Sequence, residues 1–246
     1  MEVKLDEVAV VVKLDQALAQ PDTKRRYNQR LFATIAARYD LITRLLSFGQ
    51  DQVWKQRVVE LARVTPGDSV LDLACGTGDL AARSAAIGAR VVGLDLTPPM
   101  LVLAREKRAN SQLIAGDMCA LPIADSRFSV VTVGYGLRNV PDLPSALAEI
   151  HRVLKPGGRL CALDFDKPEA AWLRAIYLGY LNAVGGALGW VLHRDPDTYR
   201  YIPASIARYP GARGVMSLLE SAGFVHVRHV KLLGGLMAIH VAEKAI

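Results

Sequence analysis

Residues 70–81 of the chain read Val-Leu-Asp-Leu-Ala-Cys-Gly-Thr-Gly-Asp-Leu-Ala. The mostly apolar run at 70–73 predicts a buried parallel strand, and the glycines at 76 and 78 predict a tight turn that opens a helix. Glycine suits such a turn because a side chain would forbid its dihedral angles or fill the space that a ligand needs. We therefore expect a ligand to approach bare backbone at Gly76, Thr77 and Gly78.

The glycine pattern by itself leaves two kinds of ligand open. With Ala81, and with Asp95 closing the next strand, it also fits the fingerprint of dinucleotide-binding proteins. Asp72 favours another ligand, because a carboxylate in this strand would lie near the ligand and repel a pyrophosphate. It suits a cation, such as the ammonium or sulfonium group of S-adenosylmethionine. A second interpretation, in which Asp72 only caps the glycine turn, stays open.

A regular alternation of strands and helices surrounds this stretch. Apolar runs predict strands at 69–74, 90–95, 112–116, 128–134 and 159–165, with helices at 80–88, 99–109 and 145–154. Residues 155–158, Lys-Pro-Gly-Gly, are expected to end the last helix and turn into the fifth strand. Two final strands, 225–232 and 236–242, are predicted to form a hairpin. The alternation predicts an α/β fold with a mainly parallel sheet.

The chain of 246 residues, 51% hydrophobic and 22% charged, is expected to form a single domain, 1–246. We divide it into an N-terminal extension with helices (1–64), a cofactor-binding core (65–165), a helical lid insertion (166–214) and a C-terminal helix with the hairpin (215–246). Internal repeats are absent from the sequence.

Polar residues follow the predicted strands at the edge of the sheet where ligands of such folds bind. Asp95 can accept hydrogen bonds from both hydroxyls of a ribose, and Asp117 can accept one from an adenine amino group. Plainer roles, a helix N-cap for Asp95 and a turn cap for Asp117, stay open. The residues expected to bind the cofactor are Asp72, Gly76, Thr77, Gly78, Asp95, Leu96, Asp117, Met118 and Gly134.

The order of elements resembles the class I methyltransferases that use S-adenosylmethionine. More specific motifs resemble the ubiquinone and menaquinone C-methyltransferase family, and they span residues 39–240. They are Tyr39-Asp40, Leu46-Ser47-Phe48-Gly49, Trp54, Gly136-Leu137-Arg138-Asn139-Val140, the run 152–158, Tyr199-Arg200-Tyr201 and Ser205-Ile206. The resemblance implies a Rossmann-like sheet of seven strands with an antiparallel C-terminal hairpin, a helical N-terminal extension and a helical lid.

The resemblance also implies the reaction. The substrate would be a reduced polyprenyl quinone with one unsubstituted ring carbon, which attacks the methyl group of S-adenosylmethionine. Arg138 can stabilise the phenolate and Asn139 can orient its oxygen or a water molecule. Tyr199, Tyr201 and His240 are further catalytic candidates, each of which could equally be a packing residue. His151 and His193 are expected to be structural.

Some positions depart from the family pattern. The chain has Ile42-Thr43 and Asp51 where the family usually has Met-Asn and a histidine. It has Asp164-Phe165-Asp166-Lys167-Pro168 where the family usually reads Glu-Phe-Ser-Lys-Pro. The latter, with the Gly234 to Met237 run, is more similar to the phylloquinone branch. The exact quinone therefore stays open.

Charge and cysteine content indicate where the protein works. The net charge is +6, but the basic residues are spread out and the densest run, Lys24-Arg25-Arg26, is short. This favours a solvated surface or an anionic membrane over nucleic acid. The spacing of Cys75, Cys119 and Cys161 suits neither disulfides nor a metal, which predicts buried thiols. With an acidic start, Met-Glu-Val-Lys-Leu-Asp-Glu, the sequence predicts a cytoplasmic protein without a metal.

One apolar segment suggests contact with a lipid phase. Residues 175–192 carry no formal charge, although they include four glycines and an asparagine. This composition favours a hydrophobic lid or an interfacial helix over a membrane-spanning helix. The expected partners are a lipophilic quinol and the periphery of a membrane at its inner face, with a homodimer left open.

Three other functions compete with quinol methylation. A methyltransferase could act on another small hydrophobic phenol, as the departures at 42–43 and 164–166 suggest. A cofactor-binding scaffold of a quinone pathway could lack catalysis, against which Arg138 and Asn139 count. A nicotinamide oxidoreductase is the third, with Asp72 as the main objection.

Overall fold

The structure is a computed structural model that describes residues 14–107, 111–168, 170–194 and 197–246. The acidic stretch at 1–7 and the end of the helix predicted at 99–109 lie outside the described residues. A seven-stranded sheet forms the centre, in the order β3-β2-β1-β4-β5-β7-β6. Six of the strands run in the same direction, and β7 is antiparallel to them. This confirms the predicted fold class.

The strands follow the predicted apolar runs. They are β1 (Ser69–Leu73), β2 (Arg90–Asp95), β3 (Ser111–Ala115), β4 (Phe128–Gly134), β5 (Leu154–Phe165), β6 (Phe224–Leu232) and β7 (Met237–Lys244). In β1, Val70, Leu71 and Leu73 are wholly buried. A central parallel strand is covered on both faces, which is why its sequence lacks an apolar and polar alternation.

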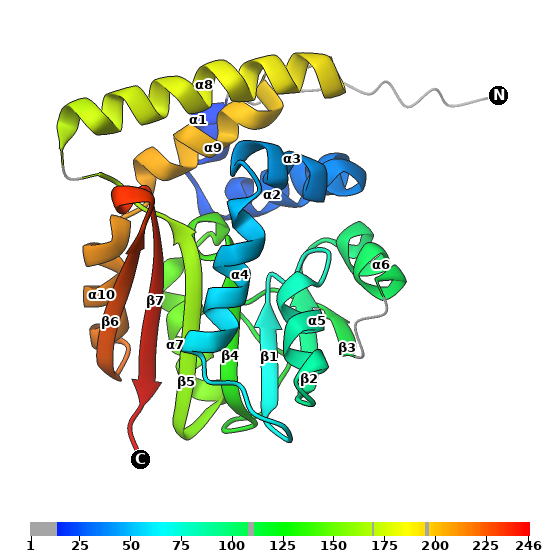
Figure 1. The fold of residues 1–246 in the computed structure, drawn as a ribbon, viewed down its shortest axis with the longest axis vertical. Coiled ribbons are helices and arrows are strands. Elements are labelled where there is room, and N and C mark those ends of the chain that lie inside the picture. Colours follow the sequence, from blue (N-terminus) through cyan, green and yellow to red (C-terminus); the bar gives the residue numbers. More distant parts are fainter. Residues whose placement is uncertain (1–13, 108–110, 169, 195–196) are drawn as a thin grey trace.

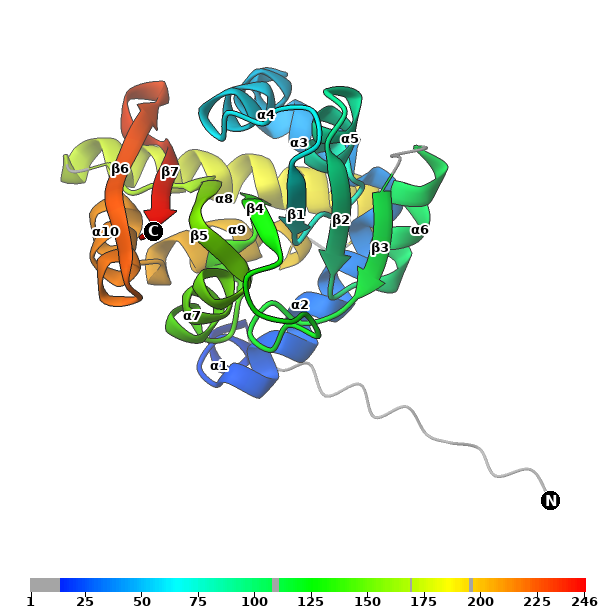
Figure 2. The same cartoon turned by 90° about the horizontal axis from the view of Figure 1, so that it is seen from below.

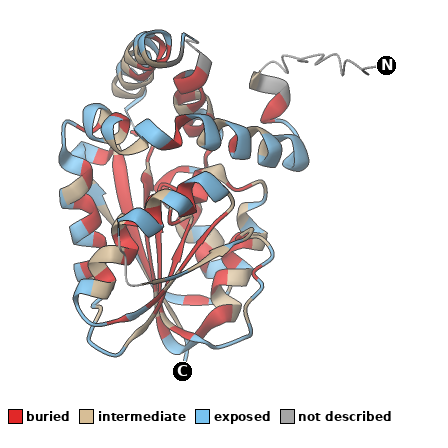
Figure 3. Ribbon diagram, turned by 90° about the vertical axis from the view of Figure 1, so that its right-hand side faces the viewer, coloured by how far each residue is buried: buried red, intermediate tan, exposed pale blue. Residues whose placement is uncertain are grey.

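Helices cover both faces of the sheet. Figure 2 shows α4 (Gln50–Leu61) and α5 (Asp79–Ala86) on one face, and α7 (Leu143–Val153) and α10 (Gly211–Ser221) on the other. The remaining helix of the core, α6 (Pro98–Glu106), packs beside the edge strand β3. Figure 3 shows the buried strands between helices whose outer sides are exposed. The core therefore lies between the sheet and its two helical layers.

Two groups of helices lie above the carboxyl ends of the parallel strands (Figure 1). The N-terminal group is α1 (Leu14–Ala17), α2 (Pro21–Ile35), the short η1 (Ala36–Arg38) and α3 (Tyr39–Leu46). The second group is α8 (Ala171–His193) with α9 (Asp197–Arg208), which pack against each other. The helical segment predicted at 166–214 thus comprises α8 and α9, and α10 begins at Gly211.

The prediction for residues 155–158 was wrong in one respect. They do not form a turn between α7 and a strand that begins at 159, because β5 already starts at Leu154. The pairing with β4 shifts from Phe128↔Leu154 to Val130↔Arg159. Gly157 has φ +70°, a conformation that lets the strand take up its extra residues as a bulge.

The predicted C-terminal hairpin is confirmed. Strands β6 and β7 pair antiparallel through the short η3 (Leu233–Gly235). Gly234 and Gly235 have φ of +64° and +97°, which explains the two glycines at the connection.

Candidate active site

A cavity of about 90 Å³ lies at the carboxyl ends of β1 to β4. Six of the predicted cofactor residues line it: Gly76, Asp95, Leu96, Asp117, Met118 and Gly134. The parallel strands bring them together because their carboxyl ends meet at one edge of the sheet. We call this space the cofactor cavity.

Asp95 ties the glycine turn to the end of β2. Its Oδ2 accepts a hydrogen bond from the backbone N–H of Gly76 at 2.8 Å, and its Oδ1 accepts one from Thr97 at 2.8 Å. Burial raises the pKa of this carboxyl, although both hydrogen bonds act in the opposite direction. Since each carboxylate oxygen has a second lone pair, Asp95 can still accept from a ligand hydroxyl.

Asp72 does not lie in the wall of the cofactor cavity. It is 1% exposed, and its carboxylate accepts hydrogen bonds from the N–H of Ala81 at 3.0 Å and the hydroxyl of Thr132 at 2.9 Å. Burial raises its pKa to about 7. The carboxylate therefore braces the start of α5 against β4, which favours the capping interpretation over direct contact with a cationic ligand.

Thr77 and Gly78 also lie beside the cofactor cavity rather than in its lining. The hydroxyl of Thr77 donates a hydrogen bond to Asp40 Oδ1 at 2.6 Å. Gly78 has φ +83° and immediately precedes α5. Both residues shape the turn, whereas Gly76 faces the cavity.

Helix α2 forms a wall of the cofactor cavity that the sequence did not predict. Arg25 Nε lies 3.1 Å from Asp117 Oδ2, and Asn28 and Gln29 also line the space. Lys24 Nζ donates to the carbonyl oxygens of Arg138 at 3.0 Å and Val140 at 2.6 Å. The basic run at 24–26, which favoured a solvated surface, was the available signal.

A second, larger cavity of about 410 Å³ adjoins the first, and we call it the apolar cavity. Phe32, Tyr39 and Tyr135 line both spaces. Its other lining residues are mainly aliphatic and aromatic and come from α2, α3, α8, α9 and the β6–β7 connection. Arg138 is the single charged side chain among its described lining residues.

Arg138 is held by a buried ion pair. Its Nη1 donates to Asp164 Oδ1 at 2.9 Å and to the carbonyl oxygen of Tyr135 at 2.8 Å, and the guanidinium lies 4.5 Å from the ring centre of Phe165. Burial disfavours its charge, but Asp164 keeps the pKa of Arg138 above the ordinary value. Its Nε is buried without a hydrogen-bond partner among the described residues. Because Arg138 lines the apolar cavity, its guanidinium can offer a positive charge to an oxygen of a molecule bound there.

The predicted catalytic residues Asn139, Tyr199 and Tyr201 also lie at the two cavities. The hydroxyl of Tyr201 donates to Asn139 Oδ1 at 2.8 Å, and Asn139 Nδ2 donates to the carbonyl oxygen of Tyr135 at 2.8 Å. Tyr199 and Tyr201 line the apolar cavity, and Asn139 lines the cofactor cavity. The Arg138–Asn139 pair thus spans the boundary between them.

His240 lies away from both cavities. It is buried in β7, where its Nε2 lies 3.0 Å from the carbonyl oxygen of Ala212 in α10. Burial lowers the pKa of its imidazole. A packing role fits this position, because the residues at the carboxyl ends of β1 to β4 make the site and His240 faces a helix of the core.

Tyr135 and Tyr39 are site residues that the sequence reasoning did not assign to catalysis or binding. Tyr135 stands between two glycines after β4 with φ +60°, and its buried hydroxyl has no partner among the described residues. Tyr39 begins α3, and burial raises the pKa of its hydroxyl. A bulky residue in the left-handed region is strained, and such strain gathers at functional sites.

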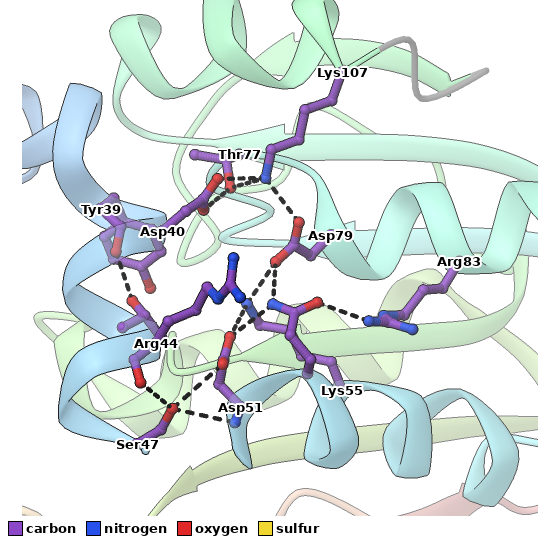
Figure 4. A network of polar contacts seen from close by, with 12 residues as sticks. Tyr39, Asp40, Arg44, Ser47, Asp51, Lys55, Thr77, Asp79, Arg83 and Lys107 are labelled. Atoms are coloured by element: carbon purple, nitrogen blue, oxygen red, sulfur yellow. Dashed lines mark hydrogen bonds and ion pairs between the residues drawn. The ribbon is translucent and has the colours of Figure 1, made fainter. Parts of the chain in front are cut away.

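A polar network fastens the N-terminal helices to the glycine turn (Figure 4). Lys107 Nζ lies 2.6 Å from Asp40 Oδ2 and 2.7 Å from Asp79 Oδ1, and Lys55 Nζ lies 2.7 Å from Asp79 Oδ2. Lys55 also pairs with the buried Asp51 at 3.1 Å. The network joins α3, α4 and the start of α5, and so holds α3 over the site.

Known methyltransferases share this fold. A S-adenosylmethionine-dependent methyltransferase of Thermotoga maritima superposes with a TM-score of 0.65 at 18% identity, covering 88% of this chain and 99% of that chain. Phosphoethanolamine N-methyltransferase 2 of Haemonchus contortus in complex with S-adenosyl-L-methionine superposes with a TM-score of 0.58 at 16% identity, covering 78% and 53%. At these identities the likeness concerns the fold.

Curated relatives are much closer in sequence. Demethylmenaquinone methyltransferase of Thermus thermophilus is 42% identical over 220 residues, covering 87% of this chain and 100% of the relative. The 2-phytyl-1,4-naphtoquinone methyltransferase of Thermosynechococcus vestitus is 42% identical over 224 residues, covering 88% and 98%. The family model of the ubiE/COQ5 methyltransferases matches residues 20–244. The chain therefore belongs to the ubiE/COQ5 methyltransferase family.

Proposed function

We propose that this chain methylates a ring carbon of a reduced polyprenyl quinone, of the demethylmenaquinol or demethylphylloquinol type. The chain is an S-adenosylmethionine-dependent methyltransferase by family. The observation that carries the substrate class is the apolar cavity of about 410 Å³, which adjoins the cofactor cavity and has Arg138 as the one charged side chain among its described lining residues. The two 42% identical relatives act, by their names, on naphthoquinones.

The cofactor cavity fits S-adenosylmethionine by its donor and acceptor groups. Asp95 and Asp117 offer carboxylate oxygens for ribose hydroxyls and an adenine amino group. A Cβ added to Gly76 would meet only the carbonyl oxygen of Ala74, at 4.0 Å, so the turn leaves open space for a ligand against its backbone. When bound there, S-adenosylmethionine supplies the methyl group.

The residues at the boundary of the cavities would activate the ring. Arg138, held in place by Asp164, would stabilise the phenolate oxygen through its positive charge, and loss of the phenolic proton raises the electron density of the ring. Asn139, fixed by Tyr201 and by the carbonyl of Tyr135, would orient that oxygen or a water molecule that takes the proton. With S-adenosylmethionine bound, the ring carbon would take its methyl group, S-adenosylhomocysteine would leave, and the proton of that ring carbon would pass to a water molecule.

The shape of the apolar cavity would contribute by positioning. Tyr39 and Tyr135 line both spaces, so a ring held between them faces the cofactor. Holding two reactants in the right geometry can lower a barrier by about 7 to 11 kcal/mol. No covalent intermediate with the protein is needed.

We also propose that the protein works in the cytoplasm at the periphery of the inner face of a membrane. Within the described residues, one helix, α8, is long and apolar enough to cross a bilayer. Of its most apolar 18-residue stretch, 22% is buried inside the protein. Its inner side, with Leu173, Tyr177 and Leu181, roofs the apolar cavity. Trp172 and Trp190 on it are each 68% exposed. A helix with one side on the protein and an apolar outer side suits an interface rather than a span.

The first test combines binding with turnover. We expect micromolar binding of S-adenosylhomocysteine in calorimetry, no binding of NADH, and methylation of reduced demethylmenaquinone in detergent. Binding without turnover of any quinol would refute the substrate and favour another hydrophobic phenol, or a scaffold if no phenol is methylated. Binding of NADH alone would refute the cofactor.

A variant at Arg138 tests the role of the guanidinium. Arg138→Lys keeps a positive charge for Asp164 but loses the planar fork, and we expect kcat to fall about 10²-fold. The dissociation constant of S-adenosylhomocysteine should stay within about twofold, because Arg138 lines the apolar cavity. Arg159→Lys, in β5 and outside the lining of both cavities, serves as the control. An unchanged kcat for Arg138→Lys would contradict this role.

A further inference from the structure

Three residues that line the apolar cavity are also widely exposed to solvent. They are Phe48 between α3 and α4 (77% exposed), Ile176 on α8 (62%) and Leu233 at the β6–β7 connection (52%). A side chain that borders a cavity and solvent at once marks its opening. In Figure 1, α8 runs across the top of the molecule above α3 and the β6–β7 connection. The cavity therefore opens between these three elements, and we call the three residues the rim.

Phe48 is held at this opening by its backbone. It has φ +50°, and the following Gly49 has φ +76°, so two successive residues adopt the left-handed region after α3. This conformation is unfavourable for phenylalanine, and an exposed aromatic ring gains little from burial. Its ring stacks with that of Tyr180 on α8, with centres 6.3 Å apart. A strained, exposed aromatic residue at the mouth of a cavity indicates a function.

The rim is continuous with further apolar surface. Leu45 on α3 is 50% exposed, and Trp172 on α8, four residues before Ile176, is 68% exposed. Arg138, the one charged side chain among the described lining residues, donates a hydrogen bond to the carbonyl oxygen of Tyr135 at the boundary with the cofactor cavity. The polar end of the space therefore adjoins the cofactor, and the rim is apolar.

The volume of the cavity limits what it can enclose. At about 410 Å³ it lies at the low end of pockets for drug-sized molecules, about 300 to 1,000 Å³. That suffices for a bicyclic ring and a short part of an attached chain. If the reacting ring faces the cofactor between Tyr39 and Tyr135, a long chain on the ring has to leave through the opening.

We infer that Phe48, Ile176 and Leu233 form the exit for the polyprenyl tail, and that their contacts set the affinity for long-tailed quinols. This inference rests on the proposed function, because it requires a quinol in the apolar cavity. The rim residues contact the tail and not the reacting ring. They should therefore change KM for a long-tailed substrate and leave kcat unchanged.

The test compares two substrates on two matched variants in detergent. Ile176→Glu places a charge at the rim, and Val191→Glu places the same charge on α8 at a residue that is 66% exposed and does not line the cavity. The substrates are reduced demethylmenaquinones with one isoprene unit and with several. We expect Ile176→Glu to raise KM about tenfold for the long tail and less than about twofold for the short one. Val191→Glu should behave as the wild type does.

A second variant keeps the test independent of the added charge. Phe48→Ala removes the exposed ring, so the core is untouched, and we expect KM for the long tail to rise about threefold. Val53→Ala, at an exposed residue of α4 outside the cavity lining, is its control.

The outcomes separate the exit from the proposed function. If the wild type methylates both quinols but the rim variants change KM equally for both tails, or not at all, the exit is refuted alone. An equal effect of Val191→Glu and Ile176→Glu would also refute it. If the wild type methylates neither quinol, the proposed function fails and the exit fails with it.

Discussion

Asp72 shows how a single buried carboxyl couples the glycine turn to the sheet. Each of its oxygens accepts one hydrogen bond, from Ala81 in α5 and from Thr132 in β4. Burial disfavours its charged form strongly enough to raise the pKa to about 7. Asp72 is therefore largely protonated in the folded protein below neutral pH, while it is ionised above about pH 4 in the unfolded chain.

This difference predicts a pH-dependent stability. As pH rises from about 4 to 7, the unfolded state loses the proton first, so the contribution of Asp72 to the free energy of unfolding falls, by up to about 4 kcal/mol. Asn in its place cannot ionise, and its amide can still accept from Ala81 and donate to Thr132. In urea unfolding, the stability of Asp72→Asn relative to the wild type should therefore rise between pH 4 and 7.

Asp125→Asn is the control, because the side chain of Asp125 is 74% exposed. A constant difference between Asp72→Asn and the wild type across this pH range would show that Asp72 is ionised in the folded protein.

The sequence predicted some single residues of the site correctly and misplaced others. Asp72 and His240 have chemically active side chains, but the apolar pattern of a strand does not tell which neighbour each side chain meets. Asp72 meets the first turn of α5, and His240 meets α10. Arg138 and Asn139 were found through the resemblance of their motif. Tyr135 was not found, because a tyrosine between two glycines carries no signal of its φ of +60°.

At the scale of elements, α2 connects the cofactor cavity to the apolar cavity. It lines both spaces, and its Lys24 ties it to two carbonyl groups of the segment 138–140. Burial lowers the pKa of Lys24. Its hydrogen bonds hold the backbone of Arg138 and Val140 in place, so α2 positions the residues at the boundary of the cavities.

Removing this tie should weaken both stability and turnover. Lys24→Met keeps the length of the side chain but leaves two carbonyl groups without a donor, and we expect a loss of about 1 to 3 kcal/mol in the free energy of unfolding. The melting temperature would fall by roughly 2 to 10 °C. Because the backbone of Arg138 is released, kcat should also fall, by about tenfold.

Arg26→Met is the matched control, since Arg26 is an exposed basic residue of the same helix. Thermal unfolding and quinol turnover are measured on both variants. If Lys24→Met melts and turns over as Arg26→Met does, α2 does not position the site.

The elements themselves followed the sequence where burial dictates a pattern. The strands overlap the predicted runs, most of which are apolar and bounded by glycine, proline or polar residues, although β5 begins at Leu154 rather than at 159. Helix α2 lies in the predicted N-terminal extension, but its individual bounds were not predicted, and it has only Asn28 and Ile35 buried. A helix that contacts the site through polar side chains has no apolar stripe, so the spacing of its apolar residues does not predict where it lies.

In the whole molecule, the sheet forms one cavity and the helices above it form most of the other. The sheet supplies the cofactor cavity at its carboxyl edge, and α2, α3, α8 and α9 supply most of the apolar cavity. The network around Asp79 and Lys107 fastens α3 to the glycine turn (Figure 4). The two cavities therefore adjoin where the helical layer touches the sheet.

The outer side of that helical layer should bind lipid. Trp172 and Trp190 are each 68% exposed on α8, whereas Trp54 is buried, so a change in tryptophan emission on lipid binding reports mainly on α8. We expect the protein to sediment with anionic liposomes and its emission to shift to shorter wavelengths as the two rings enter the interface. The net charge of +6 adds an attraction that salt weakens, while the apolar part of the binding persists.

Replacing both residues, Trp172→Ser with Trp190→Ser, should lower the partition coefficient at least about tenfold, because each ring carries apolar area worth more than about 1 kcal/mol. Val53→Ser, an exposed apolar residue on α4, should leave the partition coefficient unchanged. A wild-type protein that stays in the supernatant at low salt would show that α8 serves only as the roof of the cavity.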